Sequence, residues 1–491
     1  MIDILLVDFS AKSILPETLI YTAGHLGSTG TTTPSAWKVS SPADLAELLK
    51  SGLDNCRRDV VVLLWQQVWL SSRGGFMMLE CADKIKLHLP KATVVAAGYL
   101  PTMSPRLFLE QQSLDTVLRG YPWAHQEGDL AAALREHDII ECSHPPDFPE
   151  TLSLEKGMPY LANPETCFKR SPDNKVMTSY FTNFHCNNGC PFCFNSAFLA
   201  CGGAIIKSRK TIESDLEFLV KKHQTELIQS EDNNFFVDGA RGEDNLRYIA
   251  QHPRLSLAGN VDIMVRDVTA KRLELISAAG AHKVFFGLES LSEQQRKGIA
   301  KEFSLQQLET MLEFGQRSDC FFFGNVLLGV GNTGKSPLSS RDVERERQRV
   351  LAVLARHRNI SIEMRLFMPL LGTPFGDRIW AETGSTDNIT LPVYFEMIDR
   401  LVHSKLYPER LPLPSCFESH LTINHAATVS RALRTVNLWR TQADQARRKG
   451  WRFLLRAADI RATLGRHLLR LRLYRLIERL DRFCSLLRGR A

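Results

Sequence analysis

The chain of 491 residues is long enough for two to four domains, and its 44% hydrophobic and 23% charged residues are ordinary for a globular protein. No uncharged apolar run of 18 residues occurs, the N-terminal residues lack the basic start and long apolar run of a secretory signal, and 11 cysteines are too sparse for a disulfide scaffold. These features argue against a spanning helix, an export signal and a disulfide-stapled fold, and we expect a reducing, cytoplasmic setting.

Residues 1–143 alternate short apolar runs with helical patterns. The expected strands are Ile2–Val7, Asp59–Leu64, Ala92–Ala97 and Leu114–Arg119, and the expected helices include Ala43–Leu53 and Phe76–Leu89. This alternation predicts an α/β domain with a doubly wound, Rossmann-like parallel sheet. Such sheets bind ligands at the carboxyl ends of their strands.

Residues 144–174 are rich in proline and polar residues and are expected to form a linker or strap. Strand–helix alternation then resumes over residues 175–389, with about six units, which predicts a barrel or partial barrel. The expected strands are Met177–Phe181, Asn234–Val237, Asp262–Val265, Lys283–Gly287, Phe321–Leu328 and Ser361–Phe367. Residues 390–491 have an all-helical pattern.

Three cysteines, Cys186, Cys190 and Cys193, lie in one short segment with C-x3-C-x2-C spacing. Three thiolates on a tight loop suit an iron–sulfur cluster or zinc. Zinc would normally need a fourth ligand, and His185 and Cys201 lie near enough in the sequence to supply one. A cluster with three protein ligands instead leaves one iron open to a small molecule. The loop follows a strand and opens a six-unit α/β region, which a zinc knuckle does not need, so we favour the cluster.

With Phe192 just before the last cysteine, the loop resembles the C-x3-C-x-aromatic-C signature of radical S-adenosylmethionine enzymes. The resemblance implies a partial (β/α)6 barrel with a [4Fe–4S] cluster on Cys186, Cys190 and Cys193. In that family the open iron binds the amino and carboxylate groups of S-adenosylmethionine. An electron from an external donor cleaves the sulfonium to methionine and a 5′-deoxyadenosyl radical, which abstracts hydrogen from a substrate.

Further stretches of this region resemble the family and imply contacts with S-adenosylmethionine. Phe192 belongs to the cysteine loop itself, and Glu289 and Ser290 end a G-x-E-S stretch that is expected to face the cofactor. Asp238 is the candidate for the methionyl amine, with helix capping as the alternative. Arg266, expected at a strand end, is the candidate for the carboxylate, with a surface ion pair as the alternative.

A doubly wound domain before such a barrel resembles the cobalamin-binding domain of the cobalamin-dependent branch of these enzymes. Gly98 and Gly120 match the places where that branch often carries G-G-x-x-P and G-E, although the flanking residues here differ. A corrin ring lies flat on strand ends and needs close backbone approach, which glycine allows. A degenerate domain without a cofactor is the alternative.

The resemblance also suggests side chains for the two ends of cobalamin. No D-x-H-x-x-G motif occurs, so we do not expect a histidine below the cobalt. Trp65, Gln66 and Gln67 follow a buried strand and are candidates for covering that face. Ser71 opens the segment Ser71–Gly75, which is a candidate for holding the nucleotide tail. An ordinary strand end and a plain loop are the alternatives.

The basic character of the chain belongs to its C-terminal tail. Residues 447–491 hold 14 Lys or Arg and three acids, a net charge of +11, whereas the rest of the chain has a net charge of −4. Trp451–Leu487 carries apolar residues at helical spacing with Arg between them. This amphipathic stretch could pack on the barrel, lie on an anionic membrane surface, or recruit an acidic partner. Nucleic acid is not specifically supported.

Taken with the resemblance, these features predict an enzyme with a [4Fe–4S] cluster, S-adenosylmethionine and cobalamin. The favoured reaction is methyl transfer to an unactivated carbon of a small-molecule, lipid or peptide substrate. Cyclisation, oxidation or rearrangement, with or without cobalamin, is the alternative. A scaffold that binds cofactors without turnover is disfavoured because the three cysteines are intact.

Overall fold

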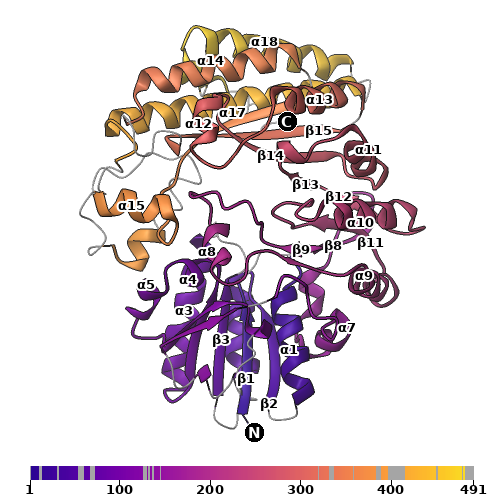
Figure 1. Cartoon of the computed structure of the whole chain (residues 1–491), viewed down its shortest axis with the longest axis vertical. Helices are drawn as coiled ribbons and strands as arrows, with labels where there is room; N and C mark the ends of the chain where they lie inside the picture. The colour runs from indigo at the N-terminus through magenta and orange to yellow at the C-terminus, as the bar shows by residue number, and fades with distance from the viewer. Residues whose placement is uncertain are drawn as a thin grey trace.

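The computed structural model describes residues 2–9, 14–29, 32–53, 60–66, 72–124, 130, 133–134, 138–143, 145–318, 320–330, 337–357, 359–382, 389–395, 415–448, 452–477 and 479–481. Figure 1 shows three parts along the long axis of the molecule. An N-terminal α/β domain lies at one end, two further sheets with outer helices lie in the middle, and long C-terminal helices cover the other end.

The N-terminal domain is built on a six-stranded parallel sheet with the order β2-β1-β3-β4-β5-β6. Its strands are β1 Ile2–Asp8, β2 Thr32–Lys38, β3 Val60–Gln66, β4 Thr93–Gly98, β5 Thr116–Gly120 and β6 Ile139–Cys142. Its main helices are α1 Glu17–Thr29, α2 Pro42–Glu47, α3 Ser72–His88, α4 Tyr99–Met103 and α5 Pro105–Leu109. The predicted doubly wound sheet is confirmed, and the strand order reverses between β1 and β3, the point at which such sheets bind ligands.

The central strands of this sheet are buried on both faces, which explains their continuous apolar sequences. Leu6, Val7, Val62 and Leu64 are fully shielded from solvent. Helices lie on both sides of a parallel sheet, so neither face of β1 or β3 meets water. Strands β2 and β6 were not predicted because they lie at the two edges and carry more polar residues.

Residues 145–174 contain short helices, including α7 Leu154–Gly157, and a short strand, β7 Lys169–Arg170. This segment packs closely on the N-terminal domain. A Cβ atom on Gly157 would lie 1.8 Å from the carbonyl oxygen of Ile20 on α1, so only glycine fits there. Asn163 exchanges hydrogen bonds with the backbone of Lys38 at 3.0 and 2.8 Å. The expected linker is therefore a folded strap.

Two four-stranded sheets, β12-β11-β8-β7 and β13-β14-β15-β16, form the middle of the molecule. Their strands are β8 Val176–Tyr180, β11 Thr225–Ser230, β12 Ser256–Ala258, β13 Asn260–Ile263, β14 Lys283–Glu289, β15 Phe321–Leu328 and β16 Ile360–Leu366. Only Gly259, with φ +81°, separates β12 from β13, so the chain bends from one sheet into the next. All pairs except β7–β8 are parallel, and the six successive strand–helix units form the predicted partial barrel.

Helices cover the outer side of this barrel (Figure 1). They are α9 Arg209–His223, α10 Gly239–Gln251, α11 Ala270–Ala278, α12 Glu293–Lys297, α13 Leu305–Arg317, α14 Ser340–Arg356 and α15 Pro374–Glu382. Ser304 and Ser339 begin α13 and α14 with capping boxes, which satisfy the first backbone N–H groups. These helices leave the carboxyl ends of the strands open to a central space.

One predicted strand of the barrel is wrong. The expected strand Asn234–Val237 is a turn, and the strand is β11, Thr225–Ser230, several residues earlier. The apolar run misled the assignment because Phe235 and Phe236 are buried beneath the start of α10 rather than in the sheet. The strand therefore ends at Ser230, and Glu231, Asp232 and Asn233 follow it.

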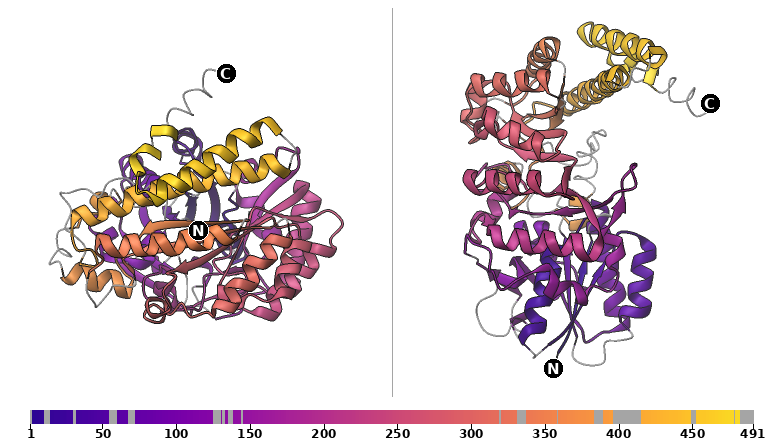
Figure 2. Two further views of the ribbon diagram at one scale, coloured as in Figure 1. Left: turned by 90° about the horizontal axis from the view of Figure 1, so that it is seen from above. Right: turned by 90° about the vertical axis from the view of Figure 1, so that its right-hand side faces the viewer.

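The C-terminal region forms two long helices, α17 His420–Arg448 and α18 Arg452–Arg470. Helix α17 packs on β16, where Asn437 Nδ2 donates to the carbonyl oxygen of Ile362 at 2.9 Å. The two helices run side by side across one end of the molecule, as both views in Figures 1 and 2 show. Of the helices that the structure describes, none is both long and apolar enough to cross a membrane.

Candidate functional site

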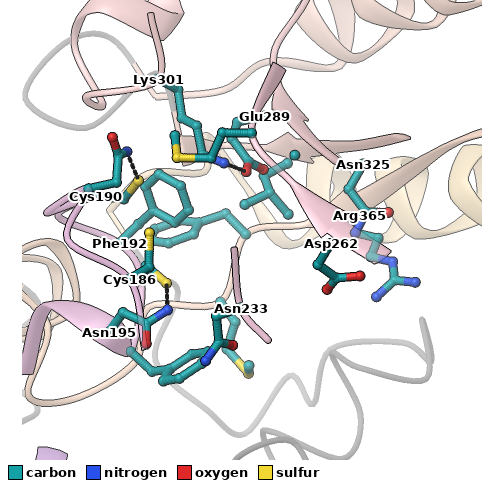
Figure 3. A pocket seen from close by; sticks show the side chains of 18 of the residues that line it. Cys186, Cys190, Phe192, Asn195, Asn233, Asp262, Glu289, Lys301, Asn325 and Arg365 are labelled. Carbon is teal, nitrogen blue, oxygen red and sulfur yellow. Dashed lines mark hydrogen bonds and ion pairs between the residues drawn. The ribbon is translucent and has the colours of Figure 1, made fainter. Parts of the chain in front are cut away.

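The cysteine loop lies between β9, Asn183–Phe184, and α8, Asn195–Leu199. His185 and Gly189 have φ of +65° and +62°, and these left-handed residues fold the loop back on itself. Cys186, Cys190 and Cys193 all line one cavity of about 390 Å³, and Figure 3 shows it from close by.

The opposite wall of the cavity comes from the ends of the barrel strands. Along β14, Phe285, Gly287 and Glu289 line the cavity, whereas the alternate residues Val284, Phe286 and Leu288 are fully buried against the helices. The same alternation brings in one polar side chain from each of the other three strands of this sheet. These are Asp262 from β13, Asn325 from β15 and Arg365 from β16. Asp262 and Arg365 lie across the cavity from the cysteines (Figure 3).

Two asparagines direct amide groups at the sulfur atoms. Asn188 Nδ2 lies 2.8 Å from Cys190 Sγ and also donates to the carbonyl oxygen of Ala300 at 2.7 Å. Asn195 Nδ2 lies 3.7 Å from Cys193 Sγ. Burial raises the pKa of all three cavity thiols, that of Cys193 to about 12. Thiolates here therefore need a bound cation such as iron or zinc to stabilise them.

The residues that could complete a zinc site do not join the three cysteines. His185 Nε2 lies 2.7 Å from the hydroxyl of Tyr121, and Nδ1 lies 3.0 Å from Asn195 Oδ1. Cys201 does not line the cavity. Within the described ranges, no group of three or more His, Cys, Asp and Glu side chains is placed to hold one metal ion. In a cluster each thiolate binds a different iron, so the geometry favours a cluster over zinc.

A buried ion pair lies beside the cysteines. Glu289 Oε1 lies 3.1 Å from Lys301 Nζ, and the two side chains are only 8% and 13% exposed. Burial opposes the charge on Lys301, but Glu289 and then Cys190 outweigh it and raise the pKa of the ammonium. Glu289 also has φ +56°, a conformation that is costly for a residue with a side chain and that turns the end of β14.

The wall opposite the cysteines carries a neutral acid. Burial, and then the nearby Glu231 and Asp232, raise the pKa of Asp262 to about 8. This shift favours the protonated form of Asp262, which can donate a hydrogen bond. Asn233, three residues after the end of β11, also lines the cavity, and its side chain lies within hydrogen-bonding reach of the Tyr99 hydroxyl.

No protein-family model and no curated protein matches the sequence. Solved structures do match the fold. The radical S-adenosylmethionine methyltransferase TsrM from Kitasatospora setae, with cobalamin and a [4Fe–4S] cluster bound, aligns with a TM-score of 0.58 and 14% identity over 88% of each chain. The same enzyme with tryptophan and an S-adenosylmethionine analogue aligns with a TM-score of 0.56 and 17% identity over 78% of this chain and 77% of that chain.

The cobalamin-dependent S-adenosylmethionine radical enzyme OxsB, with aqua-cobalamin and S-adenosylmethionine bound, aligns with a TM-score of 0.58 and 11% identity. The alignment covers 95% of this chain and 72% of OxsB. The chain has the fold of the cobalamin-dependent radical S-adenosylmethionine enzymes. The resemblance noted in the sequence is therefore confirmed at the level of fold, from the N-terminal sheet to the barrel.

Within this radical S-adenosylmethionine fold, the predicted cofactor residues are only partly brought together. Phe192 and Glu289 line the cavity with the three cysteines. Ser290 does not line it: its Oγ lies 2.6 Å from Gln295 Oε1 and 3.1 Å from Glu346 Oε1, beside a smaller polar cavity.

Asp238 and Arg266 also lie outside the residues that line the cavity. Asp238 caps α10, accepting from the backbone N–H groups of Ala240 and Arg241 at 3.1 Å each, which is the alternative considered for it. Arg266 lies in a short 3-10 turn after β13 with its side chain exposed, and its carbonyl oxygen accepts from Gln307 Nε2 at 2.6 Å. Asp238 was the candidate for the methionyl amine because the strand was expected at Asn234–Val237, which would place Asp238, and not Asn233, just after its carboxyl end.

Seven polar residues that line the cavity were not among the site residues predicted from the sequence: Asn188, Asn195, Asn233, Asp262, Lys301, Asn325 and Arg365. Asn325 and Arg365 lie inside predicted strands, where alternation alone does not tell which face is the cavity. Lys301 lies in a loop that reaches the cysteines only through tertiary packing. Asn233 could have been found, since it lies three residues after the end of β11 once that strand is placed correctly.

The predicted cobalamin residues lie at the carboxyl edge of the N-terminal sheet. Trp65 is buried at the end of β3 and stacks on Tyr121 with ring centroids 5.7 Å apart, and its Nε1 has no hydrogen-bond partner among the described residues. Gly98 and Gly120 end β4 and β5 with φ of +106° and +90°. Gln66 ends β3, but its side chain is not described, and Gln67 and Ser71 lie outside the described residues.

This edge of the N-terminal sheet faces the cysteine loop. Tyr99, which follows β4, lies 5.4 Å from the His185 ring and 5.0 Å from the Phe194 ring between centroids. Tyr121, which follows β5, donates or accepts a hydrogen bond at His185 Nε2. The fold thus brings the ligand edge of the first domain against the loop that carries the three cysteines.

Proposed function

We propose that the protein is a cobalamin-dependent radical S-adenosylmethionine enzyme, and that it transfers a methyl group to an unactivated carbon of its substrate. One observation carries the proposal. Three thiols from a single loop line a cavity at the carboxyl ends of a partial barrel, and an α/β domain of the cobalamin-binding type lies against that loop.

The cavity fits the cluster and S-adenosylmethionine chemically. The cluster, when bound to Cys186, Cys190 and Cys193, supplies the electron that breaks the sulfonium carbon–sulfur bond. Glu289 can accept from an α-ammonium group, and Lys301 can donate to an α-carboxylate, so this pair suits the zwitterionic end of the cofactor.

The remaining lining suits the rest of the cofactor and the substrate. Phe192, Phe285 and Leu327 offer apolar surface to an adenosine group, and Asn233 and Asp262 offer donors within the same cavity. The mostly apolar lining disfavours water near the reacting atoms, which protects a carbon radical from side reactions.

The edge of the N-terminal sheet fits a corrin. Gly98 leaves the end of β4 without a side chain, whereas the Cys142 backbone fills the space beside Gly120, and the Trp65 indole N–H is a buried donor without a partner among the described residues. A corrin carries amide side chains that accept hydrogen bonds from such a donor. Cobalamin, when bound, supplies the methyl-carrying cobalt. The solved structures with this fold contain cobalamin, which supports the assignment.

The first test is turnover of S-adenosylmethionine by the reconstituted protein with a low-potential reductant. Wild-type protein should release 5′-deoxyadenosine and methionine. Cys186→Ala, Cys190→Ala and Cys193→Ala should lower the rate to background, since each removes a cluster ligand. Cys81→Ala is the matched control, because Cys81 is a buried cysteine of α3 outside the cavity. Turnover by the loop variants at the control rate would contradict the proposal.

Methyl transfer can be tested without the natural substrate. With added hydroxocobalamin and reductant, the protein should release S-adenosylhomocysteine from S-adenosylmethionine, and this release should depend on the corrin. 5′-Deoxyadenosine without any corrin-dependent S-adenosylhomocysteine would instead support the cyclisation, oxidation or rearrangement chemistries.

A further inference from the structure

Helix α18 and the turn that follows it expose an apolar surface that packing does not use. The exposed fractions are 66% for Ile460, 41% for Leu464, 55% for Leu471, 46% for Leu473 and 42% for Leu476. We call the exposed side chains of residues 460–477 the C-terminal face. Large apolar side chains that stay this exposed in one short stretch are a sign of an interaction surface.

These residues are not a poorly packed core. The opposite side of α18 packs on α17 through Ala462, Leu468 and Leu469, which are at most 5% exposed. A Cβ atom on Gly465 would lie 2.7 Å from Val436 and 2.9 Å from Trp439, so the two helices are in close contact. The helix thus has one apolar stripe that packs on α17 and a second that faces away from the protein.

The C-terminal face is also strongly cationic. Residues 460–477 include five Arg and no Asp or Glu. Arg466, Arg470, Arg472 and Arg475 are exposed among the apolar side chains. Arg472 pairs with Glu344 at 3.4 Å but stays 60% exposed. A second copy of this chain would therefore place arginines against arginines, which disfavours a symmetric dimer through this face.

The arrangement of leucine and arginine side chains on the C-terminal face indicates what kind of surface it binds. Protein interfaces tend to gather apolar residues in the centre and to deplete charge there. Here Arg and Leu alternate from Arg470 to Leu473, and Arg475 and Leu476 follow after the buried Tyr474. An anionic bilayer offers phosphate groups and acyl chains everywhere on its surface, so it suits such alternation. Figure 2 shows α17 and α18 lying across one end of the molecule, away from the N-terminal domain, where a flat surface can approach.

We propose that the C-terminal face docks the protein on an anionic lipid surface. The arginines bind lipid phosphates, and Ile460, Leu464, Leu471, Leu473 and Leu476 enter the boundary between headgroups and acyl chains. The helix lies on the bilayer and does not cross it. This proposal is independent of the reaction that the cavity performs.

The test is co-sedimentation of the full chain with vesicles. Phosphatidylcholine vesicles are compared with vesicles that also contain phosphatidylglycerol. Wild-type protein should bind the anionic vesicles and not the neutral ones, and added salt should weaken the binding. Binding that does not distinguish the two kinds of vesicle, or no binding to either, overturns the proposal.

Two double variants locate the surface. Ile460→Ser/Leu471→Ser removes apolar contact and Arg470→Gln/Arg475→Gln removes charge, and each should weaken binding at least about tenfold. The matched controls, Leu87→Ser and Arg254→Gln, change exposed residues elsewhere and should bind as wild type does. All substitutions lie on the surface, and circular dichroism checks that each variant is folded.

Unchanged binding by the double variants overturns the assignment to this face. Polyglutamate serves as a probe for an acidic protein partner. The contrary result is retention of the protein by immobilised polyglutamate under conditions where it does not bind anionic vesicles. That result overturns the lipid proposal in favour of an acidic protein partner.

Discussion

Asn188 and Asn195 each lie two residues from a cysteine of the loop and point an amide at its sulfur, at 2.8 and 3.7 Å. N–H groups directed at cluster sulfurs stabilise the reduced, more negative state and raise the reduction potential. The shorter contact should contribute more. The loop therefore positions the ligands and also sets how readily a bound cluster accepts an electron.

We expect Asn188→Ala to make the reduction potential of the reconstituted cluster more negative, and Asn195→Ala to do so to a smaller extent. Potentiometric titration followed by electron paramagnetic resonance measures both shifts. Equal potentials in wild type and both variants would show that these amides do not act on the cluster.

The acid at Asp262 gives a prediction for stability. Its pKa rises from 3.8 in an unfolded chain to about 8 in the folded one, first because of burial. Between these values the folded protein keeps a proton that the unfolded chain has released, so this residue lowers stability as pH rises toward 8. Glu231 and Asp232, with pKa raised to about 7 and about 6, act in the same direction.

Asp262→Asn removes this contribution, because asparagine stays neutral throughout. The difference in unfolding free energy between the variant and wild type should therefore increase as the pH is raised from about 5 to about 8. The expected increase in favour of the variant is at least about 1 kcal/mol. Urea unfolding at both pH values measures the gain. Parallel pH dependence of the two proteins would mean that Asp262 is already ionised when folded.

At the scale of elements, a buried lysine joins the N-terminal domain to the barrel. Lys207 pairs with Glu17 of α1 and lies 3.9 Å from Asp215 of α9, and all three side chains are inaccessible to solvent. Its Nζ lies 3.9 Å from the centroid of the Tyr180 ring on β8. Helices and a strand from two domains thus share one charge network.

Lys207→Met should cost about 3–5 kcal/mol of unfolding free energy, because it leaves two buried carboxyl groups without their cation. Lys210→Met is the matched control. Lys210 pairs with Glu150 but is 82% exposed, so its loss should cost less than about 1 kcal/mol. Chemical denaturation of both variants measures the costs, and similar losses would show that the buried network does not hold the domains together.

The sequence predicted best the strands whose side chains are buried on both faces of the sheet. The central strands β1, β3 and β4 are covered on both faces, so their apolar runs stand out. Strand β11 was missed because it is mostly polar, with Leu227 and Ile228 as its two apolar residues, while the more apolar Phe235–Val237 that follows forms a turn. Hydrophobicity alone does not distinguish a buried turn from a buried strand.

At the scale of the whole molecule, the sequence predicted the order of the three parts and the loop that bears the cysteines. It did not predict the composition of the cavity wall opposite that loop. Lys301, Asn325 and Arg365 reach the cavity from loops and strands far apart in the chain. Their convergence depends on how the barrel strands are aligned, and no local spacing encodes it.

The whole-molecule arrangement also relates the two proposed cofactors. The carboxyl edge of the N-terminal sheet meets the cysteine loop through Tyr99, Tyr121 and His185. A corrin at that edge would lie close to a cluster on the loop. The helices α17 and α18 cover the far end of the barrel, so lipid docking there leaves the N-terminal domain free (Figure 2).

The most direct test of the proposed site is the metal content of anaerobically reconstituted protein, followed by electron paramagnetic resonance of the reduced sample with and without S-adenosylmethionine. We predict about four irons per chain and a cluster signal that changes when S-adenosylmethionine is added. Zinc in place of iron, or a cluster signal that S-adenosylmethionine does not alter, would contradict the assignment of Cys186, Cys190 and Cys193.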